Sequence, residues 1–546
     1  MNGGALVVRA LEQAGVEVVF GLPGVHNLAI WRALAESPIR LVGVRHEQAA
    51  AYAADGYART SGEPGVALVT TGPGAANTVA ATGEAWACGS PIVVIATDIP
   101  AGLRRPGVYR GVLHETTEQA ALFGPVTKAQ LRVSDVSLIE AMVDSALQIA
   151  QLPPSRPVYL EIPTDLLLAQ PPDAEPETRE YEWRAELQEA DIRPALELLA
   201  QAERPLIWAG GGAMRAGAGE AVGELARRLA APVVTTYQAA GLLGPEHPCD
   251  AGLPPFVPEC GELWDDADLV IAIGSDLDGT STQNWAQPQP PRMLAINVDV
   301  DDATKNYRAD VVLVGDARVV THALAERVPE SAGLTALATH LERVREQAWL
   351  RLDDDEPAAT EFLRSVARAL PDDAVVVCDM CIPGYWLGGF YRPPAPRRLL
   401  YPLGWGTLGC AFPQALGAAL AGAGPTVSFS GDGGFLYAVG ELATVAQEQL
   451  PLTAVIVDDG GYGMLRYDQR AKGDPAYGVD LKTPDFEALA RTFGIEAETV
   501  DGLGDRFGAA LAHHVRDPAP SVLVAKAAID PPPNTSPRWY RRARTA

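Results

Sequence analysis

Short apolar runs rich in β-branched residues alternate with helix-length amphipathic segments along almost the whole chain. Continuous apolar runs of this length are typical of strands that are buried on both faces. Strands that alternate with helices favour parallel sheets covered by helices, so the pattern predicts an α/β fold. The expected strands cover residues 16–20, 65–70, 91–96, 205–209, 269–273, 293–298, 374–378, 426–430, 452–457 and 521–525.

Two breaks divide these elements into three blocks. Residues 170–177 are rich in proline and acidic residues, which resist helix and strand and predict an exposed linker. The second break follows a helical stretch at residues 334–352. We expect three doubly wound parallel-sheet domains, at residues 1–175, 185–350 and 355–540. From residue 531 on, we expect an irregular tail.

Composition narrows the functional classes. With 43 basic and 69 acidic residues the net charge is −26, so we expect neither nucleic acid nor a membrane as a partner. The apolar runs are shorter than the ~18 residues of a membrane helix, and the N-terminus lacks the pattern of a signal peptide. Six scattered cysteines predict a cytoplasmic protein. Cys378 and Cys381 have the spacing of zinc ligands, but the other ligands of a zinc site are missing from the sequence around them, so we assign the pair no function.

The most informative segment joins a glycine-rich turn to two acids. One apolar run ends in Gly431, Asp432, Gly433 and Gly434, and the next run leads to Asp459. Turns after neighbouring parallel strands meet at the edge of the sheet where ligands bind. The glycines and the helix after them suit a phosphate, and the acids suit Mg²⁺. An isolated pattern of this kind is more often an ordinary turn with solvated acids.

This pattern resembles the signature of thiamine-diphosphate-dependent enzymes, in which an Asp and a later Asn hold Mg²⁺ against the cofactor. The two positions lie 27 residues apart (432 to 459), as in that family. The resemblance implies that Asp432, Asp459 and the backbone carbonyl of Gly461 are metal ligands. Because Asp459 replaces the usual Asn and adds negative charge near the diphosphate, we expect Asp459→Asn to leave cofactor binding intact or to strengthen it.

The first block carries a candidate catalytic acid. Glu47 enters an alanine-rich helical segment at residues 44–59, and we expect the small residues to bury it. The segment resembles the one whose Glu bonds the aminopyrimidine of the cofactor in the same enzymes, which implies that Glu47 is catalytic. A carboxyl shielded from water can exchange a proton with a weakly basic ring nitrogen. An isolated Glu in this place is more often a surface residue in the first turn of a helix.

Residues 404–409 resemble another segment of these enzymes. The resemblance implies that the carbonyl of Gly406 accepts a hydrogen bond from the cofactor's amino group and that Leu408 wedges the cofactor into a bent shape. An isolated leucine would be assigned to the core.

Strand-to-helix turns at residues 20–27 and 70–77 resemble the family as well. The resemblance covers almost the entire chain and is greatest to the acetolactate-synthase-like branch. It implies a pyrimidine-binding, a central and a diphosphate-binding domain, in this order. It also adds three cofactor-binding residues, Pro23, Gly74 and Asn77.

Two histidines bear on the substrate. His114 stands in a Leu-His-Glu stretch and His26 in a Pro-Gly-Val-His turn, which look more like the 5-guanidino-2-oxopentanoate decarboxylases than the acetolactate synthases. A histidine near the reacting carbon can orient the substrate carboxylate or move a proton, so both are candidate catalytic residues. For each, the alternative is a hydrogen-bonded structural histidine.

The resemblance therefore implies an enzyme that uses thiamine diphosphate and Mg²⁺ to decarboxylate a 2-oxo acid, to join it to a second carbonyl compound, or both. Two alternatives stay open: an acetolactate synthase, and a catalytically silent homologue that acts as a binding or regulatory subunit. We expect no FAD, because residues 274–279 lack an Arg suited to a dinucleotide phosphate and residues 210–212 match GxGxxG poorly. Since family members share the site across a subunit interface, we expect a homodimer or a homotetramer.

Overall fold

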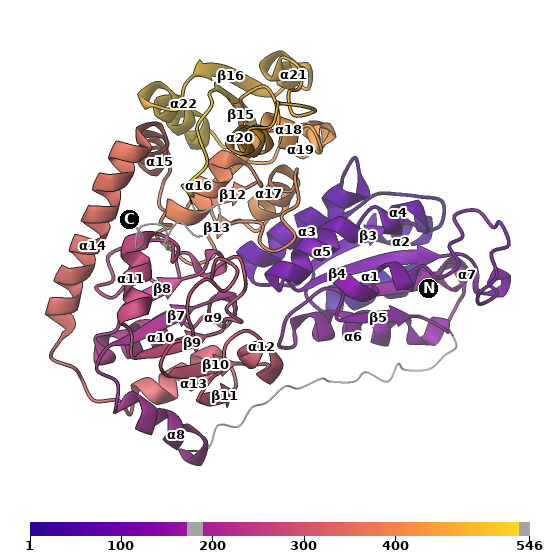
Figure 1. Ribbon diagram of the computed structural model, residues 1–546. Helices are drawn as coiled ribbons and strands as arrows, with labels where there is room; N and C mark the ends of the chain where they lie inside the picture. Colours follow the sequence, from indigo (N-terminus) through magenta and orange to yellow (C-terminus); the bar gives the residue numbers. More distant parts are fainter. Residues whose placement is uncertain (172–188, 534–546) are drawn as a thin grey trace.

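The computed structural model describes residues 1–171 and 189–533 of the chain. These residues form three α/β domains, each built on a parallel sheet (Figure 1), which confirms the fold class expected from the alternating pattern. From residue 172 on, the predicted linker lies outside the described residues, as does the predicted tail from residue 534 on. None of the described helices is long and apolar enough to cross a membrane.

The first domain has a six-stranded sheet with the strand order β2-β1-β3-β4-β6-β5, in which all neighbours run parallel. Its strands are β1 (Val18–Gly21), β2 (Arg40–Gly43), β3 (Gly65–Val69), β4 (Ile92–Asp98), β5 (Ala129–Arg132) and β6 (Val158–Pro163). Its helices are α1 (Gly3–Gln13), α2 (Leu28–Leu34), α3 (Glu47–Ser61), α4 (Pro73–Ala76), α5 (Val79–Cys88), α6 (Ile139–Gln151) and α7 (Thr164–Leu168).

The third domain repeats this topology, with the order β13-β12-β14-β15-β17-β16. Its strands are β12 (Val375–Cys378), β13 (Leu399–Leu400), β14 (Thr426–Gly431), β15 (Leu452–Asp458), β16 (Glu496–Asp501) and β17 (Ser521–Lys526). Its helices are α15 (Pro357–Ala369), α16 (Ile382–Phe390), α17 (Ala411–Leu420), α18 (Asp432–Phe435), α19 (Leu442–Glu448), α20 (Gly463–Lys472), α21 (Phe486–Thr492) and α22 (Asp505–Arg516).

The central domain has a five-stranded sheet with the order β11-β10-β9-β7-β8. Its strands are β7 (Pro205–Ala209), β8 (Val233–Thr235), β9 (Leu269–Ile273), β10 (Met293–Asn297) and β11 (Val311–Val314). Its helices are α8 (Glu189–Leu199), α9 (Gly211–Arg215), α10 (Gly219–Leu229), α11 (Pro258–Asp266), α12 (Val300–Thr304) and α13 (Ala317–Ala325). The long helix α14 (Leu334–Asp355) then leads along the side of the molecule to the third domain (Figure 1).

Small residues allow the first and third domains to pack closely through α3 and α17. A Cβ added to Gly56 would lie 1.9 Å from the carbonyl oxygen of Gln414, and one added to Gly417 would lie 1.8 Å from that of Ala53. The two backbones therefore touch at positions where a side chain would hold them apart. This contact ties the helix that begins with Glu47 to the domain that carries Asp432.

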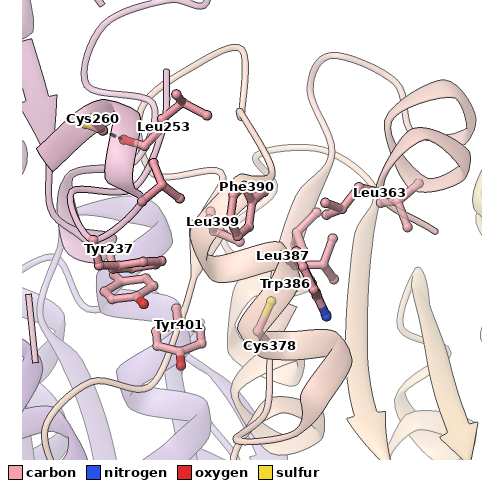
Figure 2. Packing of buried hydrophobic residues seen from close by; sticks show 14 of the residues in the cluster. Tyr237, Leu253, Cys260, Leu363, Cys378, Trp386, Leu387, Phe390, Leu399 and Tyr401 are labelled. Carbon is pink, nitrogen blue, oxygen red and sulfur yellow. Dashed lines mark hydrogen bonds between the residues drawn. The ribbon is translucent and has the colours of Figure 1, made fainter. Parts of the chain in front are cut away.

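Aromatic residues join the central and third domains (Figure 2). Tyr237 of the central domain stacks on Tyr401 of the third, with ring centroids 4.8 Å apart, and Phe256 meets Phe390 edge to face at 6.5 Å. Trp386 is fully buried beside Phe390. Aromatic pairs of this kind add packing energy beyond the area that they bury, so the central domain braces the third.

Candidate active site

Asp432 and Asp459 follow two neighbouring strands at the same edge of the third sheet. β14 and β15 pair in parallel with Gly431 opposite Val457, so the two turns start side by side. Neither carboxylate oxygen of the buried Asp432, nor Oδ1 of Asp459, has a hydrogen-bond partner among the described residues. Burial and the charge of Asp459 raise the pKa of Asp432 to about 7. Because a buried carboxylate without a hydrogen-bond partner is costly, Asp432, with Asp459 beside it, suits a cation such as Mg²⁺.

The two glycines after Asp432 leave no room for side chains. A Cβ on Gly433 would lie 2.7 Å from the ring of Tyr462, and one on Gly434 would lie 3.0 Å from a carboxylate oxygen of Asp379. The helix expected after this turn is short, because α18 has only four residues. Its dipole is therefore weak, and the backbone N–H groups of the turn are the better candidates for holding a phosphate.

The segment with Gly406 and Leu408 crosses the end of the same sheet in a conformation that favours glycine. Gly404, Gly406 and Gly409 have φ values of 96°, 64° and 76°. Leu408 is half-buried and lines the cavity described below.

Two buried acids hold this segment from opposite sides. Asp379, which follows β12, accepts a hydrogen bond from the backbone N–H of Gly409 at 3.0 Å. Glu84 of α5, in the first domain, accepts from the backbone N–H groups of Leu403 at 2.9 Å and Thr407 at 3.3 Å. Burial raises the pKa of Asp379 to about 7 and raises that of Glu84 as well. Both acids are positioning residues, because they fix the backbone on either side of Leu408.

One cavity of about 230 Å³ is lined by all eight predicted residues of the third domain. These are Gly406, Leu408, Gly431, Asp432, Gly433, Gly434, Asp459 and Gly461. Apolar side chains complete the wall, among them Met380, Ile382, Met464 and Leu465. Every lining residue belongs to the third domain, so the predicted residues of the first domain take no part in this cavity.

Glu47, Gly74 and Asn77 form a second group, in the first domain. The side-chain amide of Asn77 donates to Oε2 of Glu47 at 2.9 Å, and a Cβ on Gly74 would lie 3.5 Å from Oε1. Pro23 belongs to the same sheet edge, because it follows β1, the neighbour of β3. The expectation that Glu47 is buried within the chain is wrong, because the residue is partly exposed.

A third buried acid reaches from the third domain to the start of α3. Glu441 accepts hydrogen bonds from the backbone N–H groups of Arg45 at 3.0 Å and His46 at 3.1 Å, directly before Glu47. The hydroxyl of Thr444 donates to its other oxygen at 2.6 Å. Glu441 thereby fixes the end of the helix that carries Glu47.

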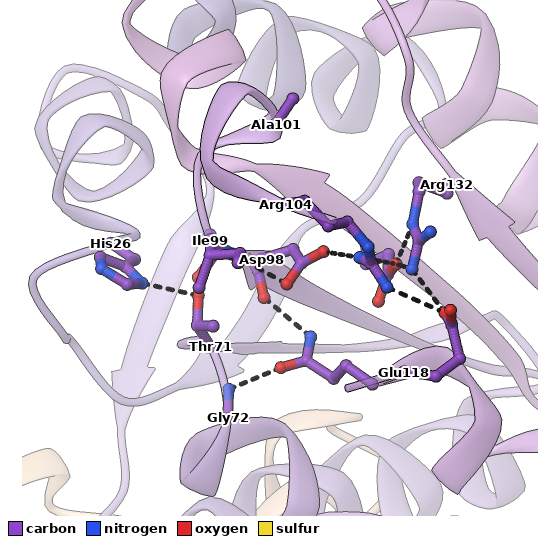
Figure 3. Close-up of polar contacts among 12 residues, drawn as sticks. His26, Thr71, Gly72, Asp98, Ile99, Ala101, Arg104, Glu118 and Arg132 are labelled. Carbon is purple, nitrogen blue, oxygen red and sulfur yellow. Dashed lines mark hydrogen bonds and ion pairs between the residues drawn. The ribbon is translucent and has the colours of Figure 1, made fainter. Parts of the chain in front are cut away.

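His26 and His114 lie together, with ring centroids 5.4 Å apart in an edge-to-face arrangement. Nδ1 of His26 is 2.8 Å from the hydroxyl of Thr71, which lies 2.8 Å from that of Thr97 (Figure 3). Burial and the neighbouring His114 lower the pKa of His26, so the ring is neutral near pH 7. The carbonyl of His114 lies over Gly72, where a Cβ would approach it to 2.5 Å.

Ion pairs fix the loop that carries His114 (Figure 3). Arg104 of this loop pairs with the buried Asp98, with Glu161 at 3.6 Å and with Glu118 at 3.0 Å. Asp98 is the last residue of β4, and Glu161 lies on the neighbouring interior strand β6. These ion pairs therefore fix the loop that places His114 beside His26.

Asp379, Glu84 and Glu441 escaped the sequence prediction. Each stands within or beside an apolar segment, and an acid in such a place is the one signal that could have found it. That signal does not name the partners, which lie 30 residues away or more in the chain.

Within residues 1–171 and 189–533, no three or more His, Cys, Asp or Glu side chains gather to hold a metal ion on their own. Asp432 and Asp459 would therefore need additional oxygens, from a backbone carbonyl, water or a bound phosphate. All six cysteines are free thiols, including Cys378 and Cys381.

Three family models match the chain in the order of its domains. They describe the thiamine pyrophosphate enzyme's N-terminal TPP binding domain at residues 1–122, its central domain at residues 192–324 and its C-terminal TPP binding domain at residues 381–525.

Curated relatives match over most of their length. A probable 2-ketoarginine decarboxylase of Pseudomonas aeruginosa is 37% identical, over 90% of this chain and 88% of its own. A probable acetolactate synthase large subunit of Methanocaldococcus jannaschii is 31% identical, over 92% and 88%. The thiamine diphosphate-dependent 4-hydroxybenzoylformate decarboxylase of Rhodococcus jostii has the same fold, with a TM-score of 0.82 and 22% identity over 97% of this chain and 100% of that one. The chain belongs to the thiamine pyrophosphate enzymes, in the branch of the acetolactate synthases and 2-oxo acid decarboxylases.

Proposed function

We propose that the protein binds thiamine diphosphate through Mg²⁺ and decarboxylates a 2-oxo acid. The observation that carries this proposal is the buried Asp432, neither of whose carboxylate oxygens has a hydrogen-bond partner, in one cavity with the half-buried Asp459 and Leu408. When bound, thiamine diphosphate supplies a nucleophilic carbon and an electron sink for the electrons that the departing carboxylate leaves behind.

Each predicted residue of the third domain has a role in holding the cofactor. Oxygens of Asp432, Asp459 and the Gly461 carbonyl would hold Mg²⁺, which in turn would bind the diphosphate. Leu408 supports the bent cofactor, and the carbonyl of Gly406 accepts from its amino group. The diphosphate lies on the backbone of the glycine turn, Gly431, Gly433 and Gly434.

The first domain provides the acid–base group. Glu47 would face the pyrimidine ring of the bound cofactor, where its carboxyl could hold or give up a proton at a ring nitrogen. The hydrogen bond from Asn77 fixes which oxygen of Glu47 faces the ring. Gly74 and Pro23 give the pyrimidine close access to the backbone.

The cavity of the third domain in one chain and the group around Glu47 in a second chain meet at the interface between the two chains. No residue of the first domain lines the cavity that contains Asp432, and Glu47 is partly exposed. Large apolar side chains are exposed beside both groups: Val25 and Leu113 near the histidines, and Trp405 and Tyr437 near the cavity. A second copy that covers these side chains would bring Glu47 to the cavity of its partner, so we propose a homodimer or a homotetramer.

His26 and His114 face the reacting end of the substrate. The neutral His26 can take up or give a proton through its second ring nitrogen, because Nδ1 is engaged by Thr71. A relative named as a probable 2-ketoarginine decarboxylase supports a guanidino 2-oxo acid as the substrate, and the acetolactate synthases support carboligation as the second candidate. We propose that the enzyme needs no FAD, and the free cysteines suit the cytoplasm.

The test is CO₂ release from aliphatic, aromatic and guanidino 2-oxo acids, with and without thiamine diphosphate and Mg²⁺. The proposal expects cofactor-dependent CO₂ from the wild type and its loss in Glu47→Gln, with His114→Asn impaired in turnover but not in cofactor affinity. Acetolactate formed from pyruvate would favour the carboligase. Absence of CO₂ with every substrate would favour the catalytically silent homologue. A yellow purified protein would contradict the proposal that the enzyme needs no FAD.

A further inference from the structure

Asp459 adds a second carboxylate beside Asp432, and the structure places one arginine against it. Nη1 of Arg466 lies 3.8 Å from Oδ1 of Asp459 and donates to its backbone carbonyl at 3.2 Å. Arg466 stands in the first turn of α20, and its backbone N–H donates to the carbonyl of Tyr462. The guanidinium therefore reaches back over the turn that precedes its own helix.

The same guanidinium covers Gly461. A Cβ on Gly461 would lie 2.8 Å from Nη2 of Arg466, so the charged group packs directly on this backbone. Nε of Arg466 donates to Oδ1 of Asp480 at 2.9 Å, and Asp480 forms an antiparallel bridge with Gly461. Arg466 thus connects the segment that contains Gly461 to the segment of Asp480 that pairs with it.

Basic side chains lie beside two of the aspartates at this edge of the sheet, and Arg466 is shared between Asp459 and Asp480. Asp458, which ends β15, is paired with Lys526 of the neighbouring strand β17. Asp459 is paired with Arg466, while Asp432 has no basic partner among the described residues. One carboxylate is thereby left for a cation to neutralise.

We propose that Arg466 is a positioning residue for the metal and diphosphate site. It offsets the charge of Asp459, which would otherwise repel the diphosphate, and it fixes the turn that presents the carbonyl of Gly461. This inference rests on the proposed function, because it assigns Arg466 a role toward the bound Mg²⁺ and thiamine diphosphate.

The test is a double-mutant cycle on the full chain, with thiamine diphosphate affinity measured by calorimetry at saturating Mg²⁺. Arg466→Gln should weaken binding about tenfold, because it leaves the carboxylate of Asp459 unpaired. Asp459→Asn should bind as well as the wild type or better. The double variant should return to within about threefold of the wild type, because the amide needs no counter-charge.

Arg470→Gln is the matched control. Arg470 lies one turn further along α20 and pairs with Asp530 at 2.8 Å, away from the carboxylate pair. It should bind thiamine diphosphate like the wild type, and a weaker control would overturn the proposal. The thermal midpoint Tm of each variant reports folding. If Arg466→Gln does not fold, Arg466→Lys replaces it and should show a smaller loss that Asp459→Asn again removes.

Two results overturn the inference. Arg466→Gln with wild-type affinity would show that the arginine has no role at the site. An equal loss with and without Asp459→Asn would show that Arg466 acts independently of the carboxylate, through the diphosphate or the fold. A wild type that binds no thiamine diphosphate would instead contradict the proposed function.

Discussion

The carboxylate of Glu441 accepts a hydrogen bond from the backbone N–H of His46 at 3.1 Å, one residue before Glu47. Glu441 follows the glycine turn of Asp432 by a few residues in the chain, and it is 1% exposed. One buried acid thus connects the start of the helix that carries Glu47 to the domain that carries Asp432. The relationship makes the position of Glu47 depend on a residue of another domain.

Glu441→Gln should lower kcat at least about tenfold, because the carboxylate accepts through both oxygens, from the backbone N–H groups and from the hydroxyl of Thr444, and an amide keeps only one acceptor oxygen. Affinity for thiamine diphosphate should stay within about threefold, since the diphosphate contacts lie elsewhere. Steady-state kinetics and calorimetry measure the two quantities. Glu448→Gln is the control, because Glu448 also joins the domains, by an ion pair with Arg40 at 3.1 Å, without contacting the start of α3.

Glu84→Gln should act on the cofactor rather than on turnover. Its carboxylate accepts from Leu403 and Thr407, and an amide placed between two N–H groups leaves one of them without a partner. A cost of about 1 kcal/mol would weaken thiamine diphosphate binding roughly fivefold. Glu140→Gln, which breaks a pair with Arg9 far from the site, should leave binding unchanged. Similar losses in both variants would contradict the assignment.

Asp379 should make the stability of the cofactor-free protein depend on pH. Burial raises its pKa to about 7 from the ordinary 3.8, so between these values the folded chain keeps a proton that the unfolded chain has lost. Stability therefore falls as pH rises from about 4 to about 7, by at most a few kcal/mol.

The Tm of the wild type and of Asp379→Asn, measured across this range, isolates the effect. The wild type should lose Tm relative to the variant as pH rises. A difference between the two proteins that does not change with pH would contradict the buried, protonated state of Asp379.

Interior strands were predictable because they are continuous apolar runs. Each of the ten predicted runs overlaps an interior strand of a sheet. Edge strands such as β2 and β5 were missed, since most of their residues are half-buried or exposed and they form no continuous apolar run. The interior strand β6 also escaped prediction, and its apolar run is interrupted by Glu161, whose charge is paired with Arg104.

The residues of the site also fall into two groups: those that a local motif predicts, and those that depend on contacts between residues far apart in the sequence. Asp432, Gly433 and Leu408 stand in local motifs, and the structure brings them into one cavity. The contact of Glu441 with His46 joins residues 395 positions apart, and no local pattern encodes it. The exposure of Glu47 could not be predicted either, because alanine content says that a helix packs closely but not which turn is covered.

The most direct measurement joins two inactive chains. Glu47→Gln and Asp432→Ala chains, carrying different tags, are produced together, and the mixed dimer is purified and assayed for CO₂ release. If Glu47 of one chain serves Asp432 of the other, each mixed dimer keeps one complete site and about half the wild-type activity per dimer. A mixed dimer as inactive as its two parents would contradict the shared site.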